Sequence, residues 1–224
     1  MIHLSRLTFD PRRAETWRDV RHPYEMHRTI LKAFGTRAGE SGVLFRIENP
    51  DENPFVLVQS VARPDWSLAG DHLCAEGPKE VRLALAQGDR FRFRLLARPS
   101  KKTADVRNDK GQGKRVDLRD PDEILKWIHE EGEGRRSRTD PERWLKEPQG
   151  FRVLDVEPTE VSLVTRSVTG QALGAREKGG SFRAVRYDGV LEVTDAVAFE
   201  TVVRTGLGPQ KAFGFGLLSV GRAK

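Results

Sequence analysis

One short segment carries side chains whose types and spacing suit proton transfer beside a phosphate. It reads Pro23-Tyr24-Glu25-Met26-His27-Arg28-Thr29, and Tyr24, His27 and Arg28 stand at i, i+3 and i+4. On a helix this spacing places all three on one face, with Lys32 one turn beyond Arg28. Imidazole exchanges protons near neutral pH, a phenol can share that work, and cations stabilise charge that develops on a phosphate. The segment therefore indicates an acid–base site, for which the plain alternative is a surface histidine in local hydrogen bonds.

A second dense signal is the glycine-rich segment Gly206–Gly216, in which Lys211 is the cation and four of the 11 residues are glycine. Glycines let backbone amides approach a phosphate closely, and a lysine adds charge. The segment matches neither the dinucleotide-binding fingerprint nor a Walker loop. The plain alternative is a tight turn between a helix and the last strand, which one or two glycines would satisfy.

Metal and disulfide chemistry find little support. The five histidines show no pair at metal-ligand spacing, and Cys74 is the only cysteine, which excludes internal disulfides and a thiolate zinc site. Acidic residues at Asp120, Asp122 and Glu123 are interpreted as helix-capping groups. We therefore expect no metal and no cofactor. The uninterrupted apolar runs, such as Phe55–Val58, fall far short of the ~20 residues of a membrane helix, and no secretory signal is recognisable, so we expect a cytoplasmic protein.

The net charge of +6 over 224 residues hides a strongly uneven distribution. Arg90–Arg119 holds 11 basic and 3 acidic residues, and smaller basic excesses lie in Arg12–Arg37 and Arg166–Arg186. Acidic stretches, Glu48–Asp89 and Asp120–Glu147, separate them. Clustered cations are what a polyanion-binding surface requires, because neutralising phosphates releases counterions. A merely solvated surface is the alternative for any single run.

Hydrophobic periodicity predicts an α+β fold of two tandem ferredoxin-like (RRM-like, βαββαβ) domains. In the first half of the sequence, this periodicity predicts six elements in order. They are a strand at residues 2–9, a helix at 23–34, strands at 43–47 and 55–61, a helix at 81–86 and a strand at 91–95. The second half repeats this order less clearly. We place a first domain at residues 1–97, with the candidate catalytic helix, and a second at 98–224, with basic loops and the glycine-rich segment.

These motifs resemble the CasE (Cse3) family of CRISPR-associated endoribonucleases. The resemblance rests on Pro23–Thr29, on Val58-Gln59-Ser60 followed by Pro64-Asp65-Trp66, on Gly113-Lys114-Arg115-Val116, and on Gly206 to Ser219. It spans nearly the whole chain in matching order. It implies two ferredoxin-like domains and metal-independent cleavage of precursor guide RNA beside a repeat hairpin, with the enzyme then remaining with the crRNA among the other Cascade subunits.

The resemblance also implies roles for residues. His27 matches the catalytic histidine and Tyr24 its neighbouring tyrosine, in an attack of the ribose 2′-hydroxyl that leaves a 2′,3′-cyclic phosphate and a 5′-hydroxyl. We expect His27 to act as general acid or base and Tyr24 to orient the reactants or share the proton. The expected RNA-binding residues are Arg28, Lys32, Lys101, Lys102, Arg107, Lys110, Lys114, Arg115, Arg166, Arg176, Lys178, Gly206, Gly208 and Lys211.

Two other functions stay open at this point. A non-catalytic module that binds hairpin RNA would also have a ferredoxin-like fold and basic loops. An enzyme that binds a nucleotide or phosphate ester through the glycine-rich segment is less favoured, because no recognised nucleotide motif surrounds that segment.

Overall fold

A computed structural model of the chain describes residues 1–51, 53–107, 113–163 and 182–223. The described chain forms two compact units, each of which is presented by itself. The first contains Met1–Ala84 together with Val203–Leu217, and the second contains Leu85–Ser162, Phe182–Val202 and Leu218–Lys224. Both units are therefore built from segments that are distant in the sequence.

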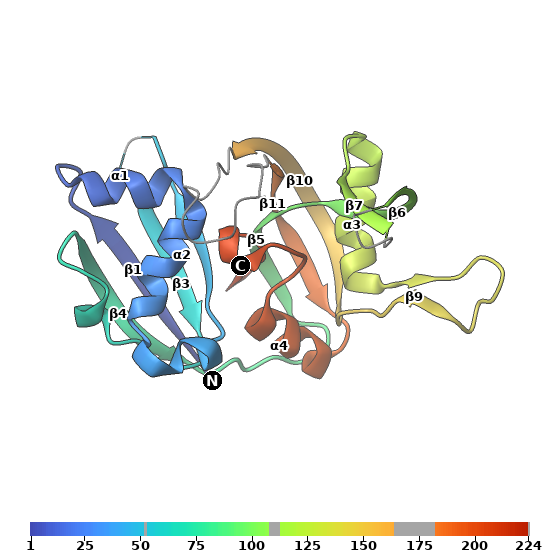
Figure 1. The fold of residues 1–224 in the computed structure, drawn as a ribbon. Coiled ribbons are helices and arrows are strands. Elements are labelled where there is room, and N and C mark those ends of the chain that lie inside the picture. Colours follow the sequence, from blue (N-terminus) through green and yellow to red (C-terminus); the bar gives the residue numbers. More distant parts are fainter. Residues whose placement is uncertain (52, 108–112, 164–181, 224) are drawn as a thin grey trace. The chain divides into compact units, whose positions relative to one another are not determined.

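The first unit is a four-stranded antiparallel sheet in the order β2-β3-β1-β4. Its strands are β1 (Ile2–Phe9), β2 (Leu44–Glu48), β3 (Phe55–Ser60) and β4 (Leu73–Val81). Helices α1 (Ala14–Arg21) and α2 (Pro23–Lys32) cover one face of the sheet (Figure 1). This is the ferredoxin-like strand order, in which the second helix is reduced to the 3₁₀ turn η2 (Trp66–Leu68). Another 3₁₀ segment, η1 (Gly35–Glu40), follows α2.

The core of the first unit lies between α2 and the sheet. Met26 and Ile30, four residues apart on α2, are fully buried, as the helical spacing predicts. From the sheet, Leu7 and Phe45 meet them, and both are also fully buried. Burying a side chain of this size stabilises the fold by about 1.5–3 kcal/mol, so these contacts fix which face of α2 points away from the core.

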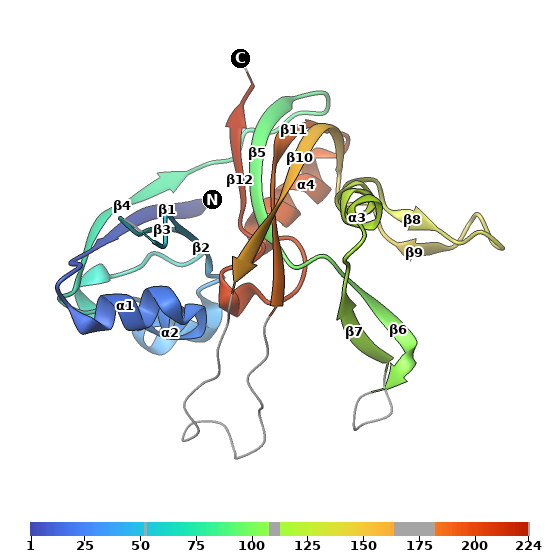
Figure 2. The same cartoon turned by 90° about the horizontal axis from the view of Figure 1, so that it is seen from above.

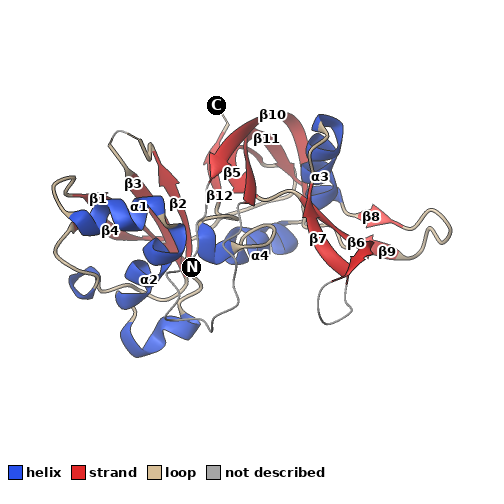
Figure 3. Cartoon of the chain, turned by 45° about the horizontal axis from the view of Figure 1, so that its top comes forward, coloured by secondary structure: helices blue, strands red, loops and turns tan. Residues whose placement is uncertain are grey.

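The second unit repeats the same topology around the sheet β10-β11-β5-β12. Its strands are β5 (Arg90–Ala97), β10 (Phe151–Leu163), β11 (Phe182–Val193) and β12 (Leu218–Arg222), and its helices are α3 (Pro121–Glu133) and α4 (Ala196–Thr205) (Figure 3). The 3₁₀ turn η3 (Lys211–Phe213), which lies between α4 and β12 in the chain, belongs to the first unit. Taken in chain order, β5, α3, β10, β11, α4 and β12 form a complete βαββαβ unit. The predicted fold of two ferredoxin-like repeats is confirmed.

Two hairpins are inserted into the second repeat and project from it in Figure 2. One pairs β6 (Ser100–Arg107) with β7 (Gly113–Asp117), and the other pairs β8 (Arg135–Arg136) with β9 (Trp144–Lys146). Within the described parts of the chain, none of the helices has the length and apolar character needed to span a bilayer.

Acidic residues cap both helices of the second unit, and for Asp120 the sequence predicted this role. The Asp120 carboxylate accepts hydrogen bonds from the amides of Asp122 and Glu123, at 2.8 and 3.1 Å. Asp195 accepts from the first amides of α4 in the same way. Each cap satisfies amides that have no partner within the helix.

Two details of the predicted first domain are wrong. The strand predicted at residues 91–95 as its last strand forms within β5 (Arg90–Ala97), but β5 pairs with β11 and β12 and so opens the second repeat instead. The fourth strand of the first sheet is β4, and the helix predicted at residues 81–86 does not form. Alternating side chains identify a strand, but they do not say which strand it pairs with, because pairing is non-local.

Gly132 lies inside α3, where replacing glycine by alanine normally stabilises a helix by about 0.5–1 kcal/mol. A Cβ atom at this position would, however, lie 2.4 Å from the carbonyl oxygen of Phe151. We therefore expect Gly132→Ala to lower the free energy of unfolding, as measured by urea denaturation. Gly39→Ala is the matched control, because a Cβ atom there meets nothing within 4 Å. A Gly132→Ala protein at least as stable as the parent would contradict this packing.

Candidate active site

Helix α2 carries the predicted acid–base pair. Pro23 occupies its first turn, where the missing amide costs no hydrogen bond. Tyr24 and His27 follow one turn apart, with their ring centroids separated by 6.5 Å. Both rings are half-buried, whereas Arg28 and Lys32 are exposed. The four side chains therefore share the helix but not one exposed face, and the two aromatic groups sit deeper than the two cations.

The His27 ring stacks on Phe45 of β2, with centroids 6.0 Å apart and planes 14° from parallel. Its Nδ1 atom is buried and has no hydrogen-bond partner among the described residues. That leaves Nε2 as the ring nitrogen available to a bound molecule. Burial also lowers the pKa of His27 below its ordinary value, because the surroundings disfavour the imidazolium. Near neutral pH the ring is therefore neutral and able to accept a proton.

The glycine-rich segment lies against the same two aromatic side chains. Phe213 contacts Tyr24, with ring centroids 5.7 Å apart, and Gly214 approaches the Phe45 ring. Lys211 begins the turn η3 that carries Phe213, and burial lowers the pKa of its ammonium group. The two motifs that sequence analysis singled out at opposite ends of the chain thus meet in the first unit.

The glycines of this segment have local structural causes. Gly206 and Gly216 both adopt positive φ, and the amide of Leu207 donates to the carbonyl of Gly216 at 2.9 Å. A Cβ atom on Gly206 would lie 2.7 Å from the Leu44 side chain. Gly208 also has positive φ. Close packing therefore accounts for more of these glycines than the tight-turn alternative allowed, and a phosphate contact by Gly206 or Gly208 remains a prediction.

Arg28 is held by its own helix. Its guanidinium contacts both carboxylate oxygens of Glu25, at 3.1 and 3.3 Å. Arg28 directly follows His27 in the sequence, so the ion pair holds a cation on the helix that carries His27. Sequence reasoning overlooked Glu25, although its i, i+3 spacing from Arg28 was a usable signal. Because Arg28 is more than half exposed, this pair orders the side chain without adding much stability.

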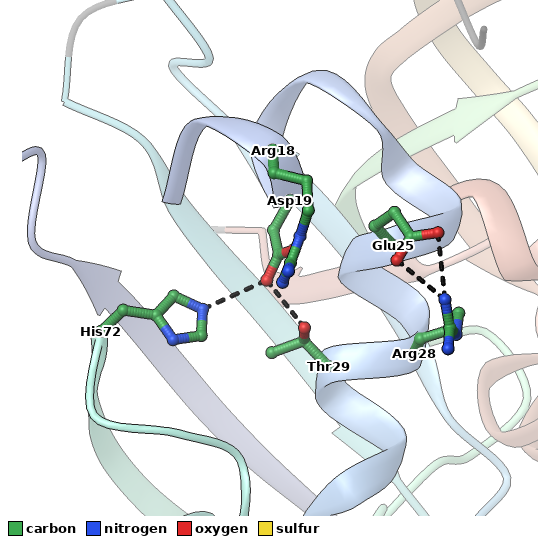
Figure 4. A network of polar contacts seen from close by, with 6 residues as sticks. All are labelled: Arg18, Asp19, Glu25, Arg28, Thr29 and His72. Atoms are coloured by element: carbon green, nitrogen blue, oxygen red, sulfur yellow. Dashed lines mark hydrogen bonds and ion pairs between the residues drawn. The ribbon is translucent and has the colours of Figure 1, made fainter. Parts of the chain in front are cut away.

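A buried polar network anchors α2 from the side of α1 (Figure 4). The Asp19 carboxylate, on α1, is fully buried and accepts a hydrogen bond from the Thr29 hydroxyl of α2 at 2.7 Å. It also contacts Nε2 of His72 at 3.1 Å and the Arg18 guanidinium. Thr29 is two residues beyond His27, so this network fixes the rotation of the helix that carries the candidate catalytic histidine.

In the second unit, the hairpin β6–β7 places like charges side by side. Lys102 and Arg115 are directly opposite each other in the register, and both are exposed. Such a pair repels and costs stability unless an anion lies between its members. Lys101, by contrast, is neutralised by Glu123 at 2.7 Å. Arg115 also donates to the Ser100 hydroxyl at 3.1 Å and interacts with the Glu131 carboxylate. Lys102, opposite it, is the cation of this pair that an added anion would stabilise most directly.

The remaining predicted contacts cannot be placed. Lys110, Arg166, Arg176 and Lys178 lie outside the described residues, and so do the side chains of Arg107 and Lys114. Over the described ranges, no group of three or more His, Cys, Asp or Glu side chains is arranged to hold a metal ion.

The comparisons with known proteins agree with the resemblance seen in the motifs. The profile of the family described as "CRISPR associated protein" matches residues 2–222. CRISPR-associated endoribonuclease Cse3 of Thermus thermophilus is 38% identical over 223 residues, which cover 97% of this chain and 98% of that protein. This chain belongs to the CasE (Cse3) family of CRISPR-associated proteins.

Two further comparisons support this family. The Cascade subunit CasE of Escherichia coli is 30% identical, covering 92% of this chain and 94% of that protein. The structure of Thermus thermophilus Cse3 bound to an RNA that represents a pre-cleavage complex superposes with a TM-score of 0.79, at 33% identity, over 98% of each chain. The family matches thus span both ferredoxin-like repeats.

Two aromatic residues of the site escaped sequence reasoning. Phe45, which stacks under His27, looked like an ordinary core residue of a buried strand, and nothing local distinguishes it. Phe213 belongs to the glycine-rich segment, whose glycines and lysine drew attention while its aromatic ring did not. Both contacts join segments far apart in the sequence, so periodicity could not find them.

Replacing Asp19 by Ala should lower the free energy of unfolding by about 2–4 kcal/mol, because it leaves the buried Thr29 hydroxyl and His72 nitrogen without their acceptor. Urea denaturation followed by circular dichroism measures the loss. The matched control is Asp71→Ala, which removes an exposed carboxylate that pairs with exposed Arg13 and should change stability little. Equal losses in the two variants would contradict the anchoring role of Asp19.

Proposed function

We propose that this chain is a metal-independent endoribonuclease that binds the CRISPR repeat hairpin, cleaves precursor crRNA and then remains with the crRNA among the other Cascade subunits. The observation that carries the proposal is the half-buried, neutral His27 beside Tyr24, with the glycine-rich segment packed against them. The relatives support it: one is named an endoribonuclease, one a Cascade subunit, and one was solved with an RNA representing a pre-cleavage complex.

The chemistry needs one base, one acid and a cation. His27 accepts through Nε2 the proton of the ribose 2′-hydroxyl, whose oxygen then attacks the adjacent phosphorus. The bond from phosphorus to the 5′-oxygen breaks, and that oxygen takes up a proton, leaving a 2′,3′-cyclic phosphate and a 5′-hydroxyl. Tyr24 orients the reacting groups or supplies the second proton. The cyclisation consumes no water and, in this proposal, uses no metal ion. The ammonium of Lys211, in the turn whose Phe213 contacts Tyr24, stabilises the charge that develops on the phosphate.

Cationic side chains bind the phosphates of the RNA stem, and base-specific contacts contribute less. An A-form stem has a deep, narrow major groove that side chains cannot read, so basic groups first meet its phosphates and its shape. Lys102 and Arg115 on the β6–β7 hairpin suit this role because their mutual repulsion is relieved by a bound phosphate. Arg28 and Lys32 are exposed on α2 for contacts nearer the scissile phosphate. The other predicted RNA contacts remain part of the same proposal.

Replacing His27 by Ala should lower the single-turnover cleavage rate by about 10²–10⁴, as expected for the loss of a general base. The assay uses the host's own repeat hairpin RNA in EDTA, with end-group analysis of both products. Because His27 is proposed to act in proton transfer, the variant should keep its RNA affinity.

A substrate with hydrogen in place of the scissile 2′-hydroxyl should bind but not be cut. Parent protein that fails to cleave in EDTA, or a His27→Ala variant that cleaves equally well, would favour the non-catalytic RNA-binding module instead.

The pH dependence of cleavage tests the role of His27 as a base. A base is active in its neutral form, so the rate should rise with pH and level off above the pKa of His27. Because burial lowers this pKa, the acidic midpoint should lie below the ordinary histidine value of about 6.5. Single-turnover rates measured across the acidic range check this. A rate that instead falls as the pH rises through this range would assign His27 the role of acid.

A further inference from the structure

The motif Val58-Gln59-Ser60 contains a polar residue that the proposed chemistry does not use. Gln59, on β3, is buried, and its amide nitrogen donates to the carbonyl oxygen of Val203 at 2.6 Å. Val203 lies in the last turn of α4, where carbonyl groups have no partner within the helix. Gln59 therefore satisfies the end of a helix at the point where the glycine-rich segment begins.

The other end of that segment is held by the neighbouring strand. Arg46, on β2, is only 3% exposed, and its guanidinium donates to the carbonyl oxygen of Leu217 at 3.1 Å. The same guanidinium pairs with Glu48 at 2.7 Å, so its charge is compensated. Gln59 and Arg46 thus bind the two ends of Val203–Leu217, which we call the clamped segment.

Between these two ends, the clamped segment passes around the edge of the first sheet. Side chains alternate between the faces of a strand, so Leu44 and Phe45 of the edge strand β2 point to opposite faces. Gly206 packs against Leu44, and Gly214 packs against Phe45. The segment therefore starts on one face, near Gln59, and reaches the other face, where Phe213 contacts Tyr24.

The segment has little regular structure of its own to maintain this path. Its backbone forms only the last turn of α4 and the three-residue turn η3. We propose that Gln59 and Arg46 are positioning residues, which fix the clamped segment so that Phe213 and Lys211 meet the helix of Tyr24 and His27. The expected effect on the cleavage rate rests on the proposed function. The expected effect on the order of residues 206–216 does not.

The first experiment needs no RNA. Gln59→Met keeps the size of the side chain but removes the donor to Val203. In the full chain, hydrogen–deuterium exchange should show loss of protection at the amides of residues 206–216, including the Leu207 amide that bonds Gly216. A second variant, Gln59→Asn, keeps the amide but is too short to reach the carbonyl, so it should give the same result.

The matched control is Ser5→Ala. It removes a buried hydrogen bond of the same sheet, from Trp66 Nε1 to the Ser5 hydroxyl at 2.9 Å, on the face that packs against the helices. It should destabilise the first unit without loosening residues 206–216. Unchanged exchange in both Gln59 variants, or equal loosening by Ser5→Ala, would overturn the inference.

The second experiment measures cleavage well below the unfolding temperature. Gln59→Met should lower the single-turnover rate about 3- to 10-fold, the range expected when one hydrogen bond is lost, while Ser5→Ala leaves it unchanged. The effect should largely disappear in the background of Phe213→Ala, because both changes act through the same segment.

Additive effects of these two changes would overturn the positioning role. If the parent protein itself did not cleave, the proposed function would fail. The exchange data would still show whether Gln59 orders the clamped segment.

Discussion

The Phe45 ring is the contact on which the candidate site depends. It is fully buried, carries the His27 ring on its face and receives Gly214 of the clamped segment. One side chain of an edge strand therefore contributes to the burial that lowers the pKa of His27 and also contacts the glycine-rich segment. An aliphatic side chain at this position would fill space but could not offer a flat surface to the imidazole.

The parts of the site that could be predicted from the sequence are those that depend on local spacing. Met26 and Ile30 recur at helical distance, which predicts both the helix and its buried face, and Tyr24 and His27 follow on the same helix for the same reason. Asp120 and Asp195 precede their helices, so their capping roles were also predictable. In each case the interacting atoms are separated by only a few residues, and the backbone geometry fixes their relation.

The parts that could not be predicted depend on pairing between distant segments. Arg90–Ala97 has the alternation of a strand on either sheet, and only its partners β11 and β12 assign it to the second repeat. The return of Val203–Leu217 to the first unit likewise depends on contacts made by Gln59 and Arg46, more than a hundred residues earlier. Resemblance to a family predicted that the glycine-rich segment matters, but not which neighbours it would have.

The path of the clamped segment determines when the candidate site can assemble during synthesis of the chain. Helix α2 and the strands that cover it leave the ribosome early, but Phe213 and Lys211 follow only after almost the entire second repeat has been synthesised. A nascent chain that has completed the first sheet therefore holds Tyr24 and His27 without the segment that packs against them. The candidate catalytic helix is therefore made before the second repeat, and the site around it is assembled only after most of that repeat.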